Sequence, residues 1–434
     1  MLELVTMTAN AIPSPVDVLV AGAGTAGVPA SIQAARAGTS VLLVEKGTMP
    51  GGTTTAARVQ FPGIFHAWGK QVIAGIGWDL VERCVAECGG PLPDFSTPPA
   101  AHWQHQVNVQ GPVFAALCDE AMQQAGVAVL YHTMLGAVER IDDLWQVTLC
   151  TKTGLQTIRA RMLVDCTGDA NLAALAGCDL RVPEPAQPAT LCCLADGYDF
   201  ATLDVSAIEE AAVQAVAEGR LQSTDAGWDR ERPRLGGWLS SGGNNANHIH
   251  GHQARTSEGR SGLEMAGRTA LLRLFRFLRT QPGLAHLRIR GVAAECGVRE
   301  TATIVGRDTI TAEDYVSGRL WPDPVCYAFY PIDLHTSDGK GLDCRQLRPG
   351  IVPSVPRGAL LPQGTEDLVV AGRCLSSDRL ANSALRVQAT AMATGQAAGA
   401  LAALACAQQT TPAAVPAPDL CALLEQNGAI VPGR

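Results

Sequence analysis

Apolar and polar positions near the start of the chain alternate in blocks that predict a strand, a helix and a second strand. Residues 17–21 form an apolar run of β-branched residues and leucine, which is typical of a strand. Residues 26–37 are expected to form a helix, because Pro29 is tolerated in a first helical turn and Gly38 follows as an end signal. A second apolar run covers residues 40–44. The pattern therefore predicts a βαβ unit.

A glycine motif, Gly22-Ala23-Gly24-Thr25-Ala26-Gly27, lies between the first strand and the helix. Gly22 permits a tight turn, Gly24 lets the backbone approach a pyrophosphate, and Gly27 lets the helix pack closely on the strand. The phosphate then meets the N-terminus of the helix. Glu45 ends the second strand about 20 residues later, where a carboxylate accepts hydrogen bonds from ribose hydroxyls. The unit is predicted to bind a dinucleotide, and both NAD and FAD use this signature.

A second glycine pair favours FAD over NAD. Lys46 and then Gly51, Gly52 and Thr53 follow Glu45, where the longer diphosphate and ribityl chain of FAD needs close backbone contact. Two later apolar runs end in Thr167-Gly168-Asp169 and in Gly372-Arg373, and both are expected to return to the same sheet. We therefore predict FAD as the cofactor, with contacts from Gly22, Gly24, Thr25, Ala26, Gly27, Glu45, Lys46, Gly51, Gly52, Thr53, Thr167, Gly168, Gly372, Arg373, Gly395, Gln396 and Ala397.

The rest of the pattern mixes helices and short strands. An amphipathic helix is expected over 111–126 and a strand over 127–131. A small meander of strands is expected around 146–149 and 157–163. The clearest helix in the second half covers 264–280, with leucine and phenylalanine on one face and arginine elsewhere.

A change in composition suggests where one domain gives way to another. The sequence becomes proline-rich from about Cys178, which is typical of a domain crossing. We predict an FAD-binding domain over 16–180 and 346–434, and a substrate domain over 181–345. The expected fold class is α/β, a Rossmann-like FAD-binding domain with an inserted α+β substrate domain.

Taken together, the motifs resemble the FAD-dependent oxidoreductase family related to fumarate reductase and succinate dehydrogenase flavoproteins, within the glutathione-reductase-like superfamily. The resemblance spans nearly the whole chain and also rests on Lys70-Gln71-Val72, Gly297 to Thr301, Tyr330 to His335, and Thr394 to Gly399. It implies a noncovalent FAD whose isoalloxazine ring lies where the FAD-binding domain meets the substrate domain. Family members often carry a second arginine where this chain has Ala302-Thr303, so the resemblance implies no arginine pair at that place.

Three side chains are candidates for chemistry on the substrate. His335 is the histidine best placed by the resemblance, either as a base or substrate ligand or in a structural role. Arg299, beside Glu300, could clamp a substrate carboxylate or form an internal ion pair. Arg386 is close in sequence to the expected flavin helix and is similarly placed.

An alanine-rich helix is expected to start near Gly395. The backbone amides of Gly395, Gln396 and Ala397 would then point at the pyrimidine edge of the flavin, where negative charge grows on reduction. The alternative is a helix that only fills the core. The uncharged segment around it, 387–418, is rich in alanine and glycine rather than leucine and isoleucine, which favours a buried helix over a membrane span.

Three alternate histidines, His248, His250 and His252, would share one face of an extended segment. A metal site, a wall of the active site and a surface strand all remain open for them. No carboxylate or cysteine nearby completes a ligand set, and Gly251 invites a bend. We predict no metal site.

Charge and cysteine content narrow the class of partner. The formal net charge is -8, which offers no electrostatic footprint for nucleic acid or an anionic membrane. The 14 cysteines lack CxxC spacing, so reduced thiols are expected rather than a zinc or iron–sulfur site. The first residues lack the basic start and apolar centre of a secretory signal. We expect a cytoplasmic protein.

These observations predict an FAD-dependent oxidoreductase, a dehydrogenase or oxidase that transfers a hydride between a small organic substrate and flavin N5. Dioxygen or a separate electron carrier would be the other partner, and a homo-oligomer is left open. A second dinucleotide motif is absent, so NADH and NADPH are expected to reduce the flavin slowly. An NAD(P)H-dependent flavin monooxygenase is the main alternative. A lyase or isomerase that uses FAD without net redox chemistry is the other.

Overall fold

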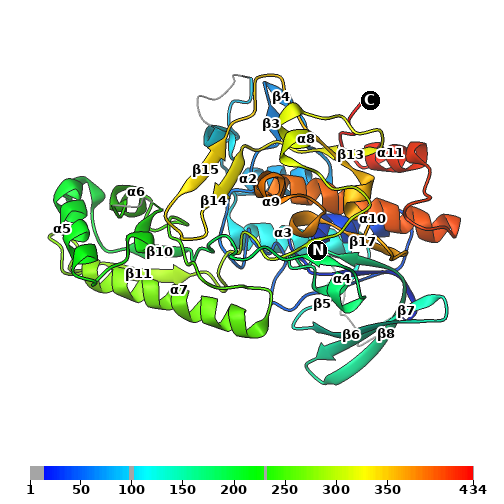
Figure 1. The fold of residues 1–434 in the computed structure, drawn as a ribbon, viewed down its shortest axis with the longest axis horizontal. Coiled ribbons are helices and arrows are strands. Elements are labelled where there is room, and N and C mark those ends of the chain that lie inside the picture. The colour runs from blue at the N-terminus through cyan, green and yellow to red at the C-terminus, as the bar shows by residue number, and fades with distance from the viewer. Residues whose placement is uncertain (1–13, 97–101, 229–231, 434) are drawn as a thin grey trace, which may run out of the picture.

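A sheet of seven strands lies in the larger part of the molecule, toward the right in Figure 1. The computed structural model describes residues 14–96, 102–228 and 232–433. The strand order is β5-β2-β1-β8-β7-β6, and β17 also pairs with β8. Strands β5, β2, β1, β8 and β17 are parallel, whereas β6 and β7 form an antiparallel meander with β8. The strands are β1 (Val16–Ala21), β2 (Val41–Val44), β5 (Ala128–Leu130), β6 (Met134–Ile141), β7 (Leu144–Thr151), β8 (Gly154–Asp165) and β17 (Leu368–Val370).

Strand β1 is buried on both faces, which explains its continuous apolar run. Val18 and Val20 pack in the core with α1 (Gly27–Arg36) and α10 (Gln388–Gln408). Leu19 and Ala21 point the other way, into the core beneath the meander. The predicted βαβ unit and the Rossmann-like α/β fold class are therefore confirmed.

Helix α10 lies buried against α1. A Cβ atom on Gly395 would lie 2.1 Å from the carbonyl oxygen of Ala26, and one on Gly399 would lie 2.1 Å from that of Ala30. Glycine at both positions lets the two helices approach closely. Within the described ranges, α10 is the helix long and apolar enough to cross a membrane by length and composition, but 83% of its most apolar window is buried inside the structure. This is the arrangement of a core helix.

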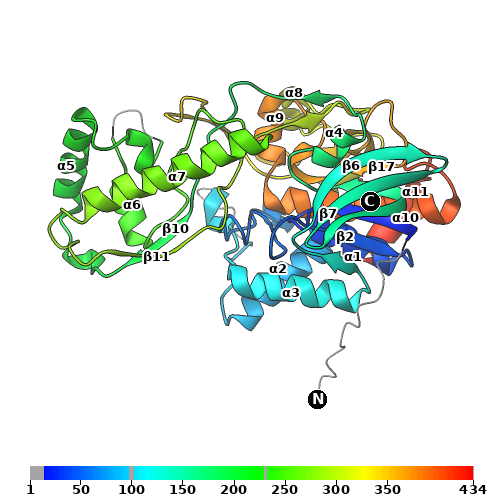
Figure 2. The same ribbon diagram turned by 90° about the horizontal axis from the view of Figure 1, so that it is seen from below.

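A lobe extends away from the sheet and carries the middle of the chain (Figures 1 and 2). Its core includes Ile208, Trp238, Leu274, Phe277 and Leu278. The long helix of the lobe matches the predicted 264–280 in part: it ends at Leu278, and it begins earlier, at Ser257, because Thr256 accepts a hydrogen bond from the N–H of Gly259. The elements of the lobe are β10 (Cys193–Asp196), α5 (Val205–Ala217), α6 (Leu235–Ser240), α7 (Ser257–Leu278) and β11 (Arg288–Val292).

The last part of the predicted substrate domain packs outside the core of the lobe. Ile304 belongs to the core beneath the meander, and Tyr315 and Ile332 belong to the core of α1 and α10. The predicted range 181–345 therefore contributes to more than one hydrophobic core. The elements after the lobe are β12 (Thr303–Ile304), α8 (Ala312–Ser317), β13 (Pro324–Tyr327), β14 (Ile332–His335), β15 (Leu342–Arg345) and β16 (Ser354–Pro356).

The remaining elements surround the sheet. The predicted helix over 111–126 and the strand over 127–131 correspond to α3 and β5. Antiparallel pairs join β3 to β4 and β9 to β12. The elements are β3 (His66–Ala67), β4 (Lys70–Gln71), α2 (Ile76–Glu87), α3 (Gly111–Gln124), α4 (Asn171–Leu175), β9 (Leu180–Arg181), α9 (Arg379–Leu385) and α11 (Ala417–Gln426).

Candidate active site

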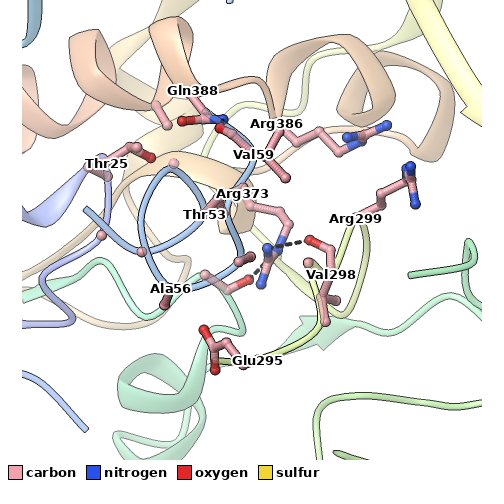
Figure 3. Close-up of a pocket in the computed structure, with 18 of the residues that line it drawn as sticks. Thr25, Thr53, Ala56, Val59, Glu295, Val298, Arg299, Arg373, Arg386 and Gln388 are labelled. Atoms are coloured by element: carbon pink, nitrogen blue, oxygen red, sulfur yellow. Dashed lines mark hydrogen bonds between the residues drawn. The ribbon is translucent and has the colours of Figure 1, made fainter. Parts of the chain in front are cut away.

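A cavity of about 730 Å³ opens at the carboxyl ends of β1 and β8, beside the start of α10 (Figure 3). The end of parallel strands is where open α/β sheets bind their ligands. Most of the residues predicted from the sequence line this cavity: Gly22, Gly24, Thr25, Ala26, Glu45, Lys46, Gly52, Thr53, Thr167, Gly168, Arg299, His335, Gly372, Arg373 and Arg386.

The three glycines of the first motif have different steric surroundings. Gly22 has a φ of +94°, and a Cβ there would lie 2.5 Å from the carbonyl oxygen of Cys166. A Cβ on Gly27 would lie 1.8 Å from the carbonyl oxygen of Gly22. A Cβ on Gly24 would meet no protein atom within 4 Å, although Gly24 lines the cavity. The chain itself explains glycine at positions 22 and 27, whereas the open space at position 24 fits a ligand such as the FAD diphosphate.

The second glycine pair fixes two loops against each other. Gly51 has a φ of +95° and donates its N–H to the carbonyl oxygen of Ala23, at 2.7 Å. A Cβ on Gly52 would lie 2.9 Å from the Cα of Gly24. Glu45 accepts hydrogen bonds from the N–H groups of Ala23 (2.7 Å) and Gly47 (2.6 Å). Gly52 lines the cavity, whereas Gly51 is not in its lining and contributes through its bond to Ala23.

Arg373 joins the two sides of the cavity wall. Its guanidinium donates to the carbonyl oxygens of Gly168 (2.7 Å) and Val298 (2.6 Å) and to Asp169 Oδ1 (2.7 Å), and the bond to Val298 is drawn in Figure 3. Thr301 Oγ1 also donates to Asp169, at 3.0 Å. These bonds hold the segment after β8 against the segment that carries Arg299.

The predicted start of the flavin helix near Gly395 is wrong. The helix begins at Gln388, so Gly395, Gln396 and Ala397 lie in its buried interior and do not line the cavity. Gln396 Oε1 accepts from the N–H of Ile76 (3.0 Å), and Gly395 serves the contact with α1. The free N–H groups of a helix are those of its first turn, which here begins at Gln388. The residue before it is Val387, which provides no side-chain cap, so no polar cap marked this start in the sequence.

Two arginines from different elements meet at one wall of the cavity. Figure 3 shows the side chains of Arg299 and Arg386 reaching the same region. Arg299 is buried and donates from Nη1 to the carbonyl oxygen of Pro188, at 2.8 Å. Burial, followed by the charge of Arg386, lowers the pKa of Arg299 to about 10, so it keeps its charge at neutral pH. Arg386 Nε is buried and has no hydrogen-bond partner among the described residues.

Asp333 and His335 lie beside the arginines. Asp333 accepts bonds from Arg386 Nη2 at its carbonyl oxygen (3.2 Å) and at Oδ2 (3.4 Å). Burial alone would raise the pKa of Asp333, but the His335 ring and the charges of Arg386 and Arg299 lower it well below its usual range. Sequence analysis missed Asp333. The signal was present, because residues two apart in strand β14 share a face, which places Asp333 beside His335.

Of the three alternate histidines, the structure brings His248 to the site. Its ring lies 2.8 Å from His335, from Nε2 to Nδ1. Burial lowers the pKa of His335 to about 4, with the charge of Arg299 as the next cause. The same two causes lower the pKa of His248 to about 3. A separate hollow is lined by all three, His248, His250 and His252, and His248 also contacts His335, a residue of the main cavity. No group of three or more metal-ligating side chains is found in the part of the chain that the structure describes.

The comparison with protein families establishes the class of protein to which this chain belongs. A family model described as FAD dependent oxidoreductase matches residues 17–424. The chain therefore belongs to the FAD-dependent oxidoreductase family, and it is an enzyme with FAD as its cofactor. No curated protein sequence matches the chain.

Several solved structures are similar to this chain at low identity. The anhydrotetracycline hydroxylase from Streptomyces rimosus is 14% identical, with a TM-score of 0.44 over 94% of this chain and 65% of the hydroxylase. The p-nitrophenol 4-monooxygenase from Pseudomonas putida is 10% identical, with a TM-score of 0.44 over 96% of this chain and 87% of the monooxygenase. A geranylgeranyl bacteriochlorophyll reductase-like protein from Thermoplasma acidophilum is 14% identical, with a TM-score of 0.40 over 95% and 83%.

Two of the three structures are described as a hydroxylase or monooxygenase, and the third as a reductase-like protein. The chain spans less than two thirds of the length of several matched structures, for example 63% and 65%. Similarity at this level does not identify the reaction.

Proposed function

We propose that the protein catalyses the two-electron oxidation or reduction of a small organic substrate that carries a carboxylate. The observation that carries this proposal is the pair of guanidinium groups of Arg299 and Arg386 on one wall of the cavity. Asp333 lies within the influence of both charges. Two cations against this one carboxylate leave an excess of positive charge that favours an anionic substrate, and a planar guanidinium suits a carboxylate.

The opposite wall is suited to the cofactor. We propose that Gly22, Gly24, Thr25 and Ala26 contact the FAD diphosphate and that Glu45 contacts a ribose. The open space at Gly24 supports this assignment. The first turn of α10, at Gln388, takes the place that the sequence assigned to Gly395. When bound, FAD supplies the redox chemistry of its isoalloxazine ring.

The side chains near the arginines bind and orient the substrate and hold its proton. Arg299 and Arg386 fix the carboxylate, and Arg386 Nε has a buried N–H left to offer. His335 is neutral at neutral pH because its pKa is lowered to about 4, so it can accept a proton. Asp333 keeps its negative charge and stabilises a proton on that ring.

We also propose that the protein is related to the fumarate reductase flavoproteins within the FAD-dependent oxidoreductase family. The family's second arginine is absent at Ala302-Thr303, where Ala302 is buried and Thr303 pairs in β12. Arg386, at the end of α9, supplies a second guanidinium beside Arg299 from another element. This supports a carboxylate substrate in spite of the departure in sequence.

The experiment is an anaerobic screen of the purified holoenzyme for loss of visible flavin absorbance. We expect one or more small carboxylic acids to bleach the flavin, and their methyl esters and amides to bleach it much more slowly. If instead the FAD is first reduced chemically, an unsaturated carboxylate should restore the absorbance. These two arms separate oxidation of the substrate from its reduction.

The same preparation tests the alternatives. Rapid bleaching by NADPH that requires an aromatic substrate would replace this proposal with a flavin monooxygenase. Turnover of a carboxylate without any change in flavin absorbance would support the lyase or isomerase alternative. Equal bleaching by acids and their uncharged analogues would contradict the role of the arginine pair.

A further inference from the structure

Three side chains form a continuous chain of close contacts that ends at the cavity. His248 Nδ1 lies 2.7 Å from the carbonyl oxygen of Gly339. His248 Nε2 lies 2.8 Å from His335 Nδ1, and His335 Nε2 lies 3.3 Å from Asp333 Oδ2. Asp333 and His335 line the FAD cavity, whereas His248 does not. The ring of His248 also stacks on Trp228, with ring centroids 5.3 Å apart.

The carbonyl group of Gly339 sets the direction of this chain. A carbonyl oxygen can only accept a hydrogen bond, so His248 must carry a hydrogen on Nδ1. In a neutral ring Nε2 is then the acceptor. His335 must therefore donate from Nδ1 to His248 Nε2. The neutral His335 ring is left with an unprotonated Nε2.

The unprotonated nitrogen lies beside the carboxylate of Asp333, which lines the cavity. Two hydrogens fill the two shortest gaps, of 2.7 and 2.8 Å. The longest gap, 3.3 Å, then separates two acceptors, His335 Nε2 and Asp333 Oδ2. The lowered pKa values of His248, about 3, and His335, about 4, support two neutral rings at neutral pH. A third proton placed in this gap would be shared by both acceptors.

We propose that His248 is a positioning residue that, with the carbonyl group of Gly339, holds His335 in the Nδ1–H tautomer and thereby keeps Nε2 free as the base of the reaction. This inference rests on the proposed function for the identity of the proton donor. In the oxidation, one substrate C–H bond breaks with its electron pair leaving as a hydride to FAD, and a second substrate bond to hydrogen (C–H, O–H or N–H) breaks as its proton forms an N–H bond at His335 Nε2. The new positive charge lies against Asp333. In the opposite direction the same proton returns to the substrate.

The charges around His335 set how readily the proton binds. The Asp333 carboxylate favours the protonated ring, whereas Arg299 and Arg386 disfavour it. His248 contacts the His335 ring, and Tyr330 and Cys344 line the FAD cavity together with His335. Burial raises the pKa values of Tyr330 and Cys344, so both are neutral at neutral pH.

The direct test is nitrogen NMR of the holoenzyme with ¹⁵N-labelled histidine and without substrate. The nitrogen shifts distinguish a protonated from an unprotonated ring nitrogen. We expect His248 and His335 both to carry hydrogen on Nδ1, with Nε2 of His335 unprotonated. Single His248→Phe and His335→Gln variants assign the two rings. Finding hydrogen on Nε2 of neutral His335 would overturn the proposal.

Variants of His248 separate tautomer control from packing. His248→Phe keeps a ring against Trp228 but removes the acceptor, so His335 should shift to the Nε2–H tautomer. We expect kcat to fall by about a hundredfold, with KM little changed because the arginines are untouched. His248→Gln keeps an oxygen that can accept from His335 and should recover much of kcat. The exposed residue His250 provides the control: His250→Ala should change neither the tautomer nor kcat.

The outcomes keep the two proposals apart. An unchanged His335 tautomer in His248→Phe would overturn the positioning role whatever the substrate is. The expected tautomers together with a failed carboxylate screen would refute the proposed substrate class and leave the positioning of His335 standing.

Discussion

The cofactor side and the substrate side of the cavity are built in opposite ways. On the cofactor side, most of the glycine loop is held by residues close in sequence, such as the bond from the N–H of Ala23 to Glu45, 22 residues away, although Gly22 also lies against Cys166. On the substrate side, Arg299 binds a carbonyl 111 residues away and His335 meets His248 across 87 residues. The first side is made of backbone and glycine, the second of buried charges and imidazoles. A local motif can specify backbone shape, whereas a charged pocket needs the whole fold.

The sharpest test of the cofactor side compares two glycines of one motif. Gly24→Val should abolish retention of FAD and leave the unfolding free energy of the apoprotein nearly unchanged, since a Cβ there meets no protein atom within 4 Å. Gly27→Val should destabilise the apoprotein by about 3 kcal/mol or more, because its Cβ would lie 1.8 Å from Gly22 O. Flavin content after gel filtration and urea unfolding of the apoproteins measure the two effects. Equal loss of stability in both variants would contradict a ligand-only role for Gly24.

On the substrate side, burial of His335 makes stability depend on pH. Its pKa falls from 6.5 to about 4 on folding, so the unfolded chain binds more protons in this interval. Stability is therefore full above about pH 6.5 and is lost as the pH falls toward 4, by about 3 kcal/mol for this group. His335→Gln should show a shallower loss over the same interval. Replacement of the exposed residue His250 by glutamine is the matched control, and an identical pH profile in both variants would refute the assignment.

The lowered pKa also predicts the acid limb of activity. A base must be unprotonated, so kcat/KM should rise with pH through the pKa of His335 and level off below neutral pH. An acid limb that persists in His335→Gln would belong to another group.

The arginine pair should affect substrate binding more than stability. Arg386→Leu and Arg299→Leu should each lower kcat/KM for a carboxylate substrate by tenfold or more, because a charge-assisted hydrogen bond contributes about 1.5–3 kcal/mol. Arg386→Lys should recover part of the loss, since it keeps the charge and loses the planar fork. Steady-state kinetics with an acid and its amide measure the effect. Equal losses for the acid and the amide would show that the arginines do not bind the carboxylate.

The same contrast explains what could be predicted from the sequence. The strand, the helix and the roles of Gly22 and Gly27 follow from periodicity and spacing within a few dozen residues. The prediction misplaces the start of α10 because it assigns Gly395 to a helix start beside the flavin, whereas Gly395 is a packing glycine against Ala26. No local signal distinguishes these two uses of glycine.

The substrate side could be predicted only in part. Arg299, His335 and Arg386 were named individually, and the structure brings them to one wall. The link from His248 to His335 depends on how the lobe meets β14, which no pattern in the sequence specifies. Asp333 could have been found from its position two residues before His335 in a strand.

Lys46 provides the test with the smallest expected effect. It was predicted to bind the cofactor, but in the structure it forms an ion pair with Glu295. Its Nζ lies 2.6 Å from Glu295 Oε2, and the two side chains are 51% and 31% exposed. Arg260 Nη2 also binds Glu295, at 3.0 Å, so the carboxylate keeps a partner when Lys46 is removed. Exposed ion pairs contribute about 0.2–1 kcal/mol and weaken in salt.

Lys46→Met should therefore change the unfolding free energy and the FAD affinity by less than about 1 kcal/mol. A double mutant with Glu295→Gln should show a small coupling free energy that vanishes at high salt. A large loss of FAD affinity in Lys46→Met but not in Glu295→Gln would mean that Lys46 leaves Glu295 when FAD binds, and would return it to the cofactor side of the cavity.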